Sequence, residues 1–197
     1  MRWLIRLAAV WLLATFSAQA SAAELIVSNG KLLGATKVLV NGSYYDVSFV
    51  DGTCAALFSG CDQSSDFFFR TAADAQAASQ ALMDQVFVGE YDTSMGLTWG
   101  CINTPQSCSV LTPFAVSSTT VSTYRAWNFA LESSDRVGAT NSTPTTDTGI
   151  SSGAVYAVWS VSAAPEPATW LMMILGFGSV GHALRRRQRS GAPLALA

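Results

Sequence analysis

The side chains that most often carry catalysis are sparse in this chain of 197 residues. Its single histidine, His182, lies in an apolar stretch near the C-terminus. A nucleophilic triad or a histidine metal site needs an imidazole beside its partner groups. The remainder of the chain can build neither arrangement. The sequence therefore predicts no cofactor and no metal.

Carboxylates are the remaining candidates, because hydrolysis of a glycosidic bond uses two of them across a cleft. Asp46 with Asp51, and Asp62 with Asp66, are possible pairs, but no surrounding pattern separates them from solvated surface acids. The loop with Asp62 and Asp66 could hold calcium, yet it lacks the EF-hand spacing. We expect a protein that is not an enzyme. A carboxylate hydrolase is kept as a hypothesis that requires two facing acids in a cleft, one of them buried.

Four cysteines form two groups with equal spacing, Cys54 with Cys61 and Cys101 with Cys108. An even number of cysteines at local spacings indicates disulfides in an oxidising compartment. Of the three possible pairings we favour Cys54–Cys61 together with Cys101–Cys108. A zinc site is the rival, but structural zinc prefers cysteines two to four residues apart. We therefore predict two disulfides outside the cytoplasm.

The N-terminus has the pattern of an export signal. Arg2 and Arg6 give a positive start, and residues 7–16 form an apolar core. Small residues around Ala20 and Ala22 then fit a cleavage site. Residues 1–23 are therefore predicted to be a secretory signal peptide.

The C-terminus carries three parts in order. The sequence Pro165-Glu166-Pro167 is followed by an apolar run over residues 170–184, which begins at Trp170. Fifteen residues of helix rise roughly 22 Å, so spanning a bilayer is feasible when the flanking residues contribute. The run ends in a group of cations that should stay on the cytoplasmic side: Arg185, Arg186, Arg187 and Arg189. We predict a transmembrane helix in preference to a buried core helix, since four arginines rarely end a core helix.

This combination of Pro-Glu-Pro, Trp170, a Met- and Gly-rich span and an arginine cluster resembles the PEP-CTERM sorting signal, also named the ice-binding protein C-terminal domain. The resemblance covers residues 165–189 and implies export by a Gram-negative bacterium. It also implies transient anchoring in the inner membrane and recognition by an exosortase, a membrane-embedded cysteine transpeptidase. The signal is followed by a tail, residues 190–197, that is longer than is usual in the family.

Between the two ends lies one domain's worth of chain, residues 24–164. It contains five cations and twelve anions, a net charge of −7, whereas the whole chain has −2. Such a surface repels phosphate backbones, so we expect no nucleic-acid partner.

Residue patterns within 24–164 predict an α+β domain, an antiparallel sheet with one packed helix. Asn41-Gly42 between two apolar-alternating stretches, 37–40 and 43–50, indicates a hairpin. A capping motif at Thr71 and apolar residues at helical spacing indicate a helix that ends near Phe87. Further strands are expected at 97–101, 114–116, 125–131 and 154–161, while residues 117–124 alternate only weakly and are rich in Ser and Thr. An exposed loop is expected at 140–153.

The body itself offers no readable activity. We expect a cell-surface or extracellular-matrix protein, with exopolysaccharide as a possible partner. The alternative is a carbohydrate- or ice-binding module, in which exposed aromatic residues stack on sugar rings. The aromatic candidates for that role are Tyr44, Trp99, Trp127 and Trp159.

Overall fold

The computed structural model describes residues 22–101, 106–131, 134–151 and 153–163, with 173–174, 176–178 and 185. The chain divides into two compact units, Met1–Ser162 and Ala163–Ala197. The predicted signal peptide, apart from its last two residues, lies outside the described residues. The same holds for most of the predicted transmembrane helix.

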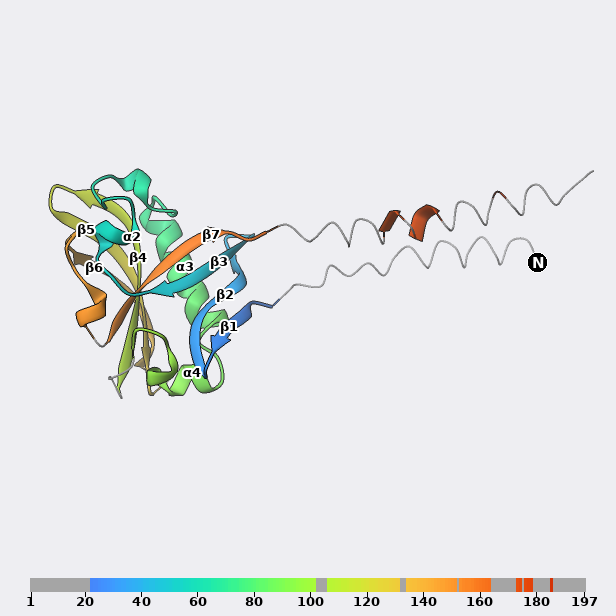
Figure 1. Ribbon diagram of the computed structural model, residues 1–197, viewed down its shortest axis with the longest axis horizontal. Coiled ribbons are helices and arrows are strands. Elements are labelled where there is room, and N and C mark those ends of the chain that lie inside the picture. The colour runs from blue at the N-terminus through green and yellow to red at the C-terminus, as the bar shows by residue number, and fades with distance from the viewer. Residues whose placement is uncertain are drawn as a thin grey trace, which may run out of the picture. The chain divides into compact units, whose positions relative to one another are not determined.

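The first unit is built on a seven-stranded sheet with the order β1-β2-β3-β7-β4-β5-β6 (Figure 1). Its strands are β1 (Glu24–Ser28), β2 (Lys31–Val40), β3 (Ser43–Val50), β4 (Ser107–Ser117), β5 (Thr120–Phe129), β6 (Arg136–Ser142) and β7 (Ala154–Val161). Helices are few, and α3 (Ala72–Gln85) is the only long one among the described residues. The domain is therefore mostly β.

The expectation of a purely antiparallel sheet was wrong, because β4 and β7 pair in parallel, with Ser109 opposite Ala154. The chain leaves the edge strand β6 and runs back across the sheet before it enters between β3 and β4. On the way it is held by the residues that follow β3. The nitrogen of Thr148 bonds to the carbonyl of Gly52, and that of Ala55 bonds to the carbonyl of Pro144. This long return path sets the direction of the last strand.

The predicted hairpin of β2 and β3 is confirmed. Val40 pairs with Ser43, and the two turn residues Asn41 and Gly42 have φ angles of 49° and 83°. Two positive φ angles in succession are what a tight hairpin turn requires, and Asn-Gly adopts them at low cost. The turn sequence alone was enough to fix this pairing.

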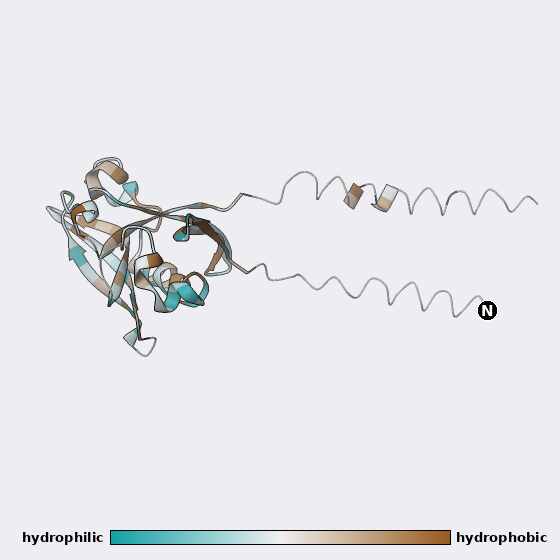
Figure 2. Ribbon diagram, turned by 60° about the horizontal axis from the view of Figure 1, so that its bottom comes forward, coloured by the Kyte–Doolittle hydropathy of each residue, from teal (hydrophilic) through white to brown (hydrophobic). Residues whose placement is uncertain are grey.

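The predicted helix is also confirmed as α3. The hydroxyl of Thr71 accepts a hydrogen bond from the nitrogen of Asp74 at 3.1 Å and so caps the first turn. Ala75, Ala78 and Leu82 are completely buried. The helix contacts β2, β4, β5 and β6, and brown and teal segments both occur along it in Figure 2. One apolar side therefore attaches it to one face of the sheet.

Hydrophobic clusters lie on both faces of the sheet. Trp159 belongs to the larger cluster beneath α3, whereas Tyr156 belongs to a smaller one on the opposite face. The smaller cluster is covered by the segment with α2 (Cys54–Leu57) and η1 (Ser64–Asp66). In this segment the ring of Phe58 contacts the rings of both Phe67 and Tyr156. The prediction that Tyr156 and Trp159 face opposite ways is confirmed, and each faces a core.

Other local predictions were wrong or incomplete. Residues 97–101 are not a strand, because Met95–Leu97 forms the short helix η2 and only Thr98 makes an isolated bridge, to Leu32. The predicted loop 140–153 begins inside β6 and contains the buried Thr148, in η4 (Thr148–Ile150). Strand β1 and the short helix α4 (Glu90–Thr93) carry no periodic signal and were not predicted.

The chain enters and leaves the sheet at the same end. Glu24, the first residue of β1, pairs with Thr36 of β2, which is close to the Val38–Tyr45 pair. Tyr45 in turn pairs with Val161, the last residue of β7. The opposite end of the sheet holds the start of β7 and the start of β4.

Candidate functional site

The segment that the sequence identifies as a sorting signal belongs to the second unit. Pro165, Glu166, Pro167 and Trp170 lie outside the described residues, as do Arg186, Arg187 and Arg189. Met173, Ile174, residues 176–178 and Arg185 are described, and all of them are helical and exposed. Over the described residues, no helix has both the length and the apolar character needed to cross a bilayer.

Both predicted disulfides are present. Cys54 and Cys61 are joined with a Cα–Cα distance of 5.7 Å, and Cys101 and Cys108 with 5.6 Å. All four cysteines are completely buried, and no described cysteine is free. Pairing within each local group therefore replaces the zinc alternative.

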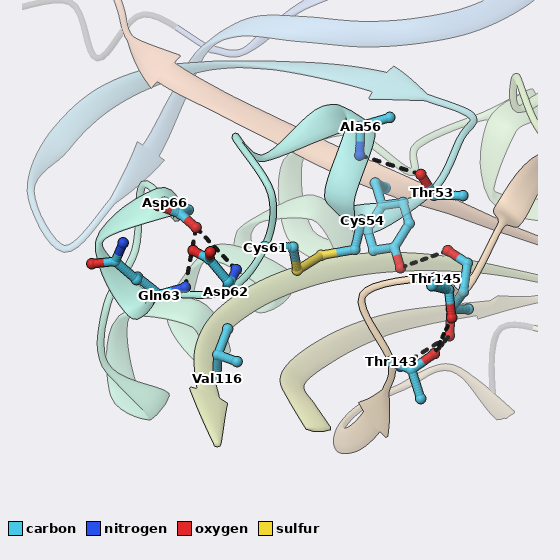
Figure 3. Close-up of a disulfide and its surroundings, with 12 residues drawn as sticks. Thr53, Cys54, Ala56, Cys61, Asp62, Gln63, Asp66, Val116, Thr143 and Thr145 are labelled. Carbon is cyan, nitrogen blue, oxygen red and sulfur yellow. Dashed lines mark hydrogen bonds between the residues drawn. A yellow bond between two sulfur atoms is a disulfide. The ribbon is translucent and has the colours of Figure 1, made fainter. Parts of the chain in front are cut away.

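The Cys54–Cys61 bridge closes the segment that covers the smaller core (Figure 3). Thr53 caps α2 by accepting a hydrogen bond from the nitrogen of Ala56 at 3.2 Å. One oxygen of Asp66 accepts from the nitrogens of Asp62 and Gln63 at 3.2 and 3.1 Å. In the loop that was considered for calcium, the carboxylate of Asp66 thus has a local structural role. Among the described residues no group of three or more potential ligands gathers as a metal site.

The Cys101–Cys108 bridge ties the turn after η2 to the start of β4. Gly100 directly precedes Cys101 and is tightly packed. A Cβ there would lie 2.8 Å from the Val155 side chain and 2.9 Å from an oxygen of Asp51. This close packing and the disulfide fix the backbone that directly follows Trp99.

The structure brings together a carboxylate pair that the sequence analysis did not propose, Asp51 and Asp147. Burial raises the pKa of Asp51, a hydrogen bond with Thr148 lowers it, and the charge of Asp147 raises it again. One Asp51 oxygen is buried without a hydrogen-bond partner, whereas Asp147 accepts from the nitrogen of Gly149 at 2.9 Å. Four cavities of about 320 to 520 Å³ lie elsewhere, and neither acid lines them.

Replacing Asp51 with asparagine should stabilise the protein at neutral pH. A carboxyl group whose pKa is raised by folding stabilises the native state fully below its unfolded pKa. That contribution disappears as the pH rises through the folded pKa. The free energy of unfolding of Asp51→Asn should therefore exceed that of the wild type at pH 7 and approach it in acid. Urea denaturation at several pH values measures this difference.

Asp62→Asn is the matched control, because it removes one charge from an exposed carboxylate. Its stability at pH 7 should equal that of the wild type. A lower stability of Asp51→Asn at pH 7 would show that the ionised carboxylate is favoured in the native state.

The four aromatic candidates for sugar stacking are separated by the fold. Trp159 is only 6% exposed and belongs to the core, while Tyr44 is 38% and Trp99 45% exposed. Trp99 borders a mainly apolar groove of about 480 Å³, which it lines together with Ile26, Ser48 and other residues of the first three strands. Of the four, Trp99 therefore has the surroundings that best fit a stacking platform.

Trp127 has a different environment. It lies on β5 directly opposite Arg136 of β6, and Arg125 precedes it by two positions on the same face of the strand. The guanidinium carbon of Arg125 is 3.5 Å from the centre of the indole ring, and that of Arg136 is 4.2 Å from it. Phe129 adds a second ring, 5.4 Å from the first. We name these four residues the Arg-Trp cluster.

The sequence analysis missed this cluster as a unit. The alternation of Arg125, Trp127 and Phe129 places three side chains on one face of a strand, and this signal was available. The contribution of Arg136 was not, because it depends on the register between β5 and β6.

Comparison with known proteins finds no match to a curated protein and none to a solved structure. A match to a known family is found at the C-terminus. Residues 163–188 fit the family model for the PEP-CTERM protein-sorting motif, and this chain therefore carries a PEP-CTERM sorting signal behind its folded domain.

Proposed function

We propose that this chain is a non-enzymatic cell-surface or extracellular-matrix protein, exported and then released from the inner membrane by an exosortase. The PEP-CTERM motif at residues 163–188 carries this proposal. Such a motif implies a processing enzyme and a C-terminal sorting signal that is anchored in the membrane.

The folded domain supports the proposal in two ways. Its two buried disulfides suit an oxidising compartment, where such bonds persist. Glu24 and Val161 lie at one end of the sheet, so a signal peptide and a C-terminal anchor would both attach there.

In this scheme the parts of the sorting signal act in sequence. The arginines from Arg185 to Arg189 stop translocation, because cations remain on the cytoplasmic side. The apolar residues hold the chain in the bilayer while the exosortase recognises the region of Pro165, Glu166 and Pro167. Removal of the anchor frees a domain with a net charge of −7, which favours solubility.

Intact-mass analysis of the protein in its host tests this proposal. In normal cells the protein should lack residues 1–23 and the part beyond the motif, and it should leave the inner membrane. Without the exosortase the anchored form should accumulate in the inner membrane with its C-terminal arginines. Replacing Pro165 and Glu166 with alanine should have the same effect as loss of the exosortase, whereas the matched replacement of Pro193 should have none. Full-length protein retained in the inner membrane of normal cells would contradict the proposal.

The alternative is a carbohydrate- or ice-binding module on the same anchor. It is supported by Trp99, whose exposed ring borders the groove on the first three strands. A glycan array tests the carbohydrate-binding alternative. If the protein binds no glycan at millimolar concentration, carbohydrate binding is excluded. Ice-crystal morphology in the presence of the protein tests the other form.

A further inference from the structure

Two hairpins of the sheet turn on the same dipeptide, asparagine followed by glycine. Asn29-Gly30 connects β1 to β2, and Asn41-Gly42 connects β2 to β3. The φ angles are 50° and 74° in the first turn and 49° and 83° in the second, so both have the same backbone form. All four residues are exposed, and a Cβ on either glycine would meet no atom within 4 Å. The two turns therefore differ only in what surrounds them.

This dipeptide can lose the asparagine side-chain amide without an enzyme. The backbone nitrogen of the glycine attacks Cγ of the asparagine and closes a five-membered imide, while the Cγ–Nδ2 bond breaks and ammonia leaves. Water then opens the imide, which gives aspartate or its isomer, in which the main chain runs through the side-chain carbon. Glycine allows the attack because it has no Cβ to shield its nitrogen and because its backbone reaches the required conformation easily.

The fold holds the side-chain amide of Asn41 but not that of Asn29. Nδ2 of Asn41 donates a hydrogen bond to Oδ1 of Asp74 at 3.1 Å, and Oδ2 of Asp74 accepts one from the hydroxyl of Thr71 at 2.7 Å. Asn41 is thus tied to the first turn of α3, and the charge of Asp74 disfavours the amide anion of Gly42 that would attack. No described residue forms a hydrogen bond with the side-chain amide of Asn29.

The strands around the two turns differ in the same direction. β1 is an edge strand of five residues that pairs only with β2, and its register is interrupted between Ile26 and Val27. β2 and β3 each pair on both sides, β3 with β7 as well. Closure of the imide requires the turn to leave its positive φ geometry. A hairpin with one edge strand opens locally at a lower free energy than one built from two interior strands.

We propose that Asn29 is a site of spontaneous deamidation in the folded protein, whereas Asp74 protects Asn41 from the same reaction. Asn29 lines the groove beside Trp99, and Lys31 lines it too. Deamidation therefore places a carboxylate in this mainly apolar groove and changes its charge as the protein ages. The isomer also lengthens the main chain within a two-residue turn, which weakens the pairing of β1. This inference goes beyond the proposed function and does not depend on exosortase processing.

Peptide mapping by mass spectrometry of the full-length protein, incubated in detergent at pH 7, measures conversion at both sites in the same molecules. Asn29 should convert about tenfold faster than Asn41, since reaction at Asn41 must first break a hydrogen bond to a carboxylate. In urea the two sites should convert at similar rates, because the dipeptides are identical. Asp74→Ala should raise the rate at Asn41 toward that at Asn29 and leave Asn29 unchanged. Asp84→Ala is the matched control, because Asp84 is an acid of the same helix that accepts a hydrogen bond from another amide, that of Gln80.

Several outcomes would overturn the proposal. Equal rates at the two sites of the native protein, or a faster reaction at Asn41, would show that the fold does not select Asn29. A difference that persists in urea would assign the selectivity to the flanking residues, and an unchanged rate at Asn41 in folded Asp74→Ala would remove the protecting role. Circular dichroism monitors the fold of this variant. If Asp74→Ala unfolds, Asp74→Asn keeps the shape of the side chain without its charge and should accelerate Asn41 alone.

Discussion

Replacing Gly34 with alanine is expected to destabilise the domain strongly. Gly34 lies within β2 at a φ angle of +149°, which side chains rarely adopt. A Cβ at this position would lie 2.0 Å from the carbonyl oxygen of Val47 and 3.0 Å from the Cα of Ser48. Both neighbours are backbone atoms of β3, so relief requires separation of the strands. Backbone strain and overpacking together should cost about 3 kcal/mol or more.

Gly138→Ala is the matched control, since this glycine also lies in a strand, β6. A Cβ there would meet no atom within 4 Å, and its φ angle is not positive. Urea denaturation followed by tryptophan fluorescence should show a large loss for Gly34→Ala and little change for Gly138→Ala. Equal stability of the two variants would mean that β2 and β3 are not packed as described.

Loss of both disulfides should leave the domain close to unfolding. Each bridge closes a loop of about eight residues, which is worth roughly 2.5 kcal/mol in the chain-entropy model. The two bridges lie in different hydrophobic clusters, so their contributions should nearly add, to about 5 kcal/mol. Because small domains are stable by only about 5–15 kcal/mol, this loss is decisive.

Variants that remove one bridge each make the comparison quantitative. One double variant combines Cys54→Ala with Cys61→Ala, and the other combines Cys101→Ala with Cys108→Ala. Each should still unfold cooperatively, at a lower urea concentration than the wild type. The variant without all four cysteines should be degraded after export or lack a folded baseline. Thiol alkylation with mass analysis confirms the redox state. A reduced wild-type protein that is as stable as the oxidised one would contradict the expected contribution.

Local sequence signals were sufficient where neighbouring residues decide the structure. The Asn41-Gly42 turn fixed the β2–β3 hairpin, because only residues that tolerate positive φ angles form such a turn. Thr71 and the spacing from Ala75 to Val86 fixed α3. Cysteine spacing fixed the disulfide partners, since short loops close most easily. The sorting motif was readable for the same reason, because its parts follow one another along the chain.

Long-range contacts could not be predicted in this way. The parallel pairing of β7 with β4 depends on how residues 143–153 return across the sheet, a path that no local pattern encodes. The approach of Asp51 to Asp147 depends on the same path.

What the sequence alone determined was therefore the sorting signal and the locally encoded segments of the domain: a hairpin, a helix and two short disulfide loops. The tertiary structure decided which side chains meet. Arg125 and Arg136 share Trp127 only because strands β5 and β6 pair in one register, and a shift by one residue would move each side chain to the other face. A surface built across strands depends on such pairing and is absent from any single stretch of the chain.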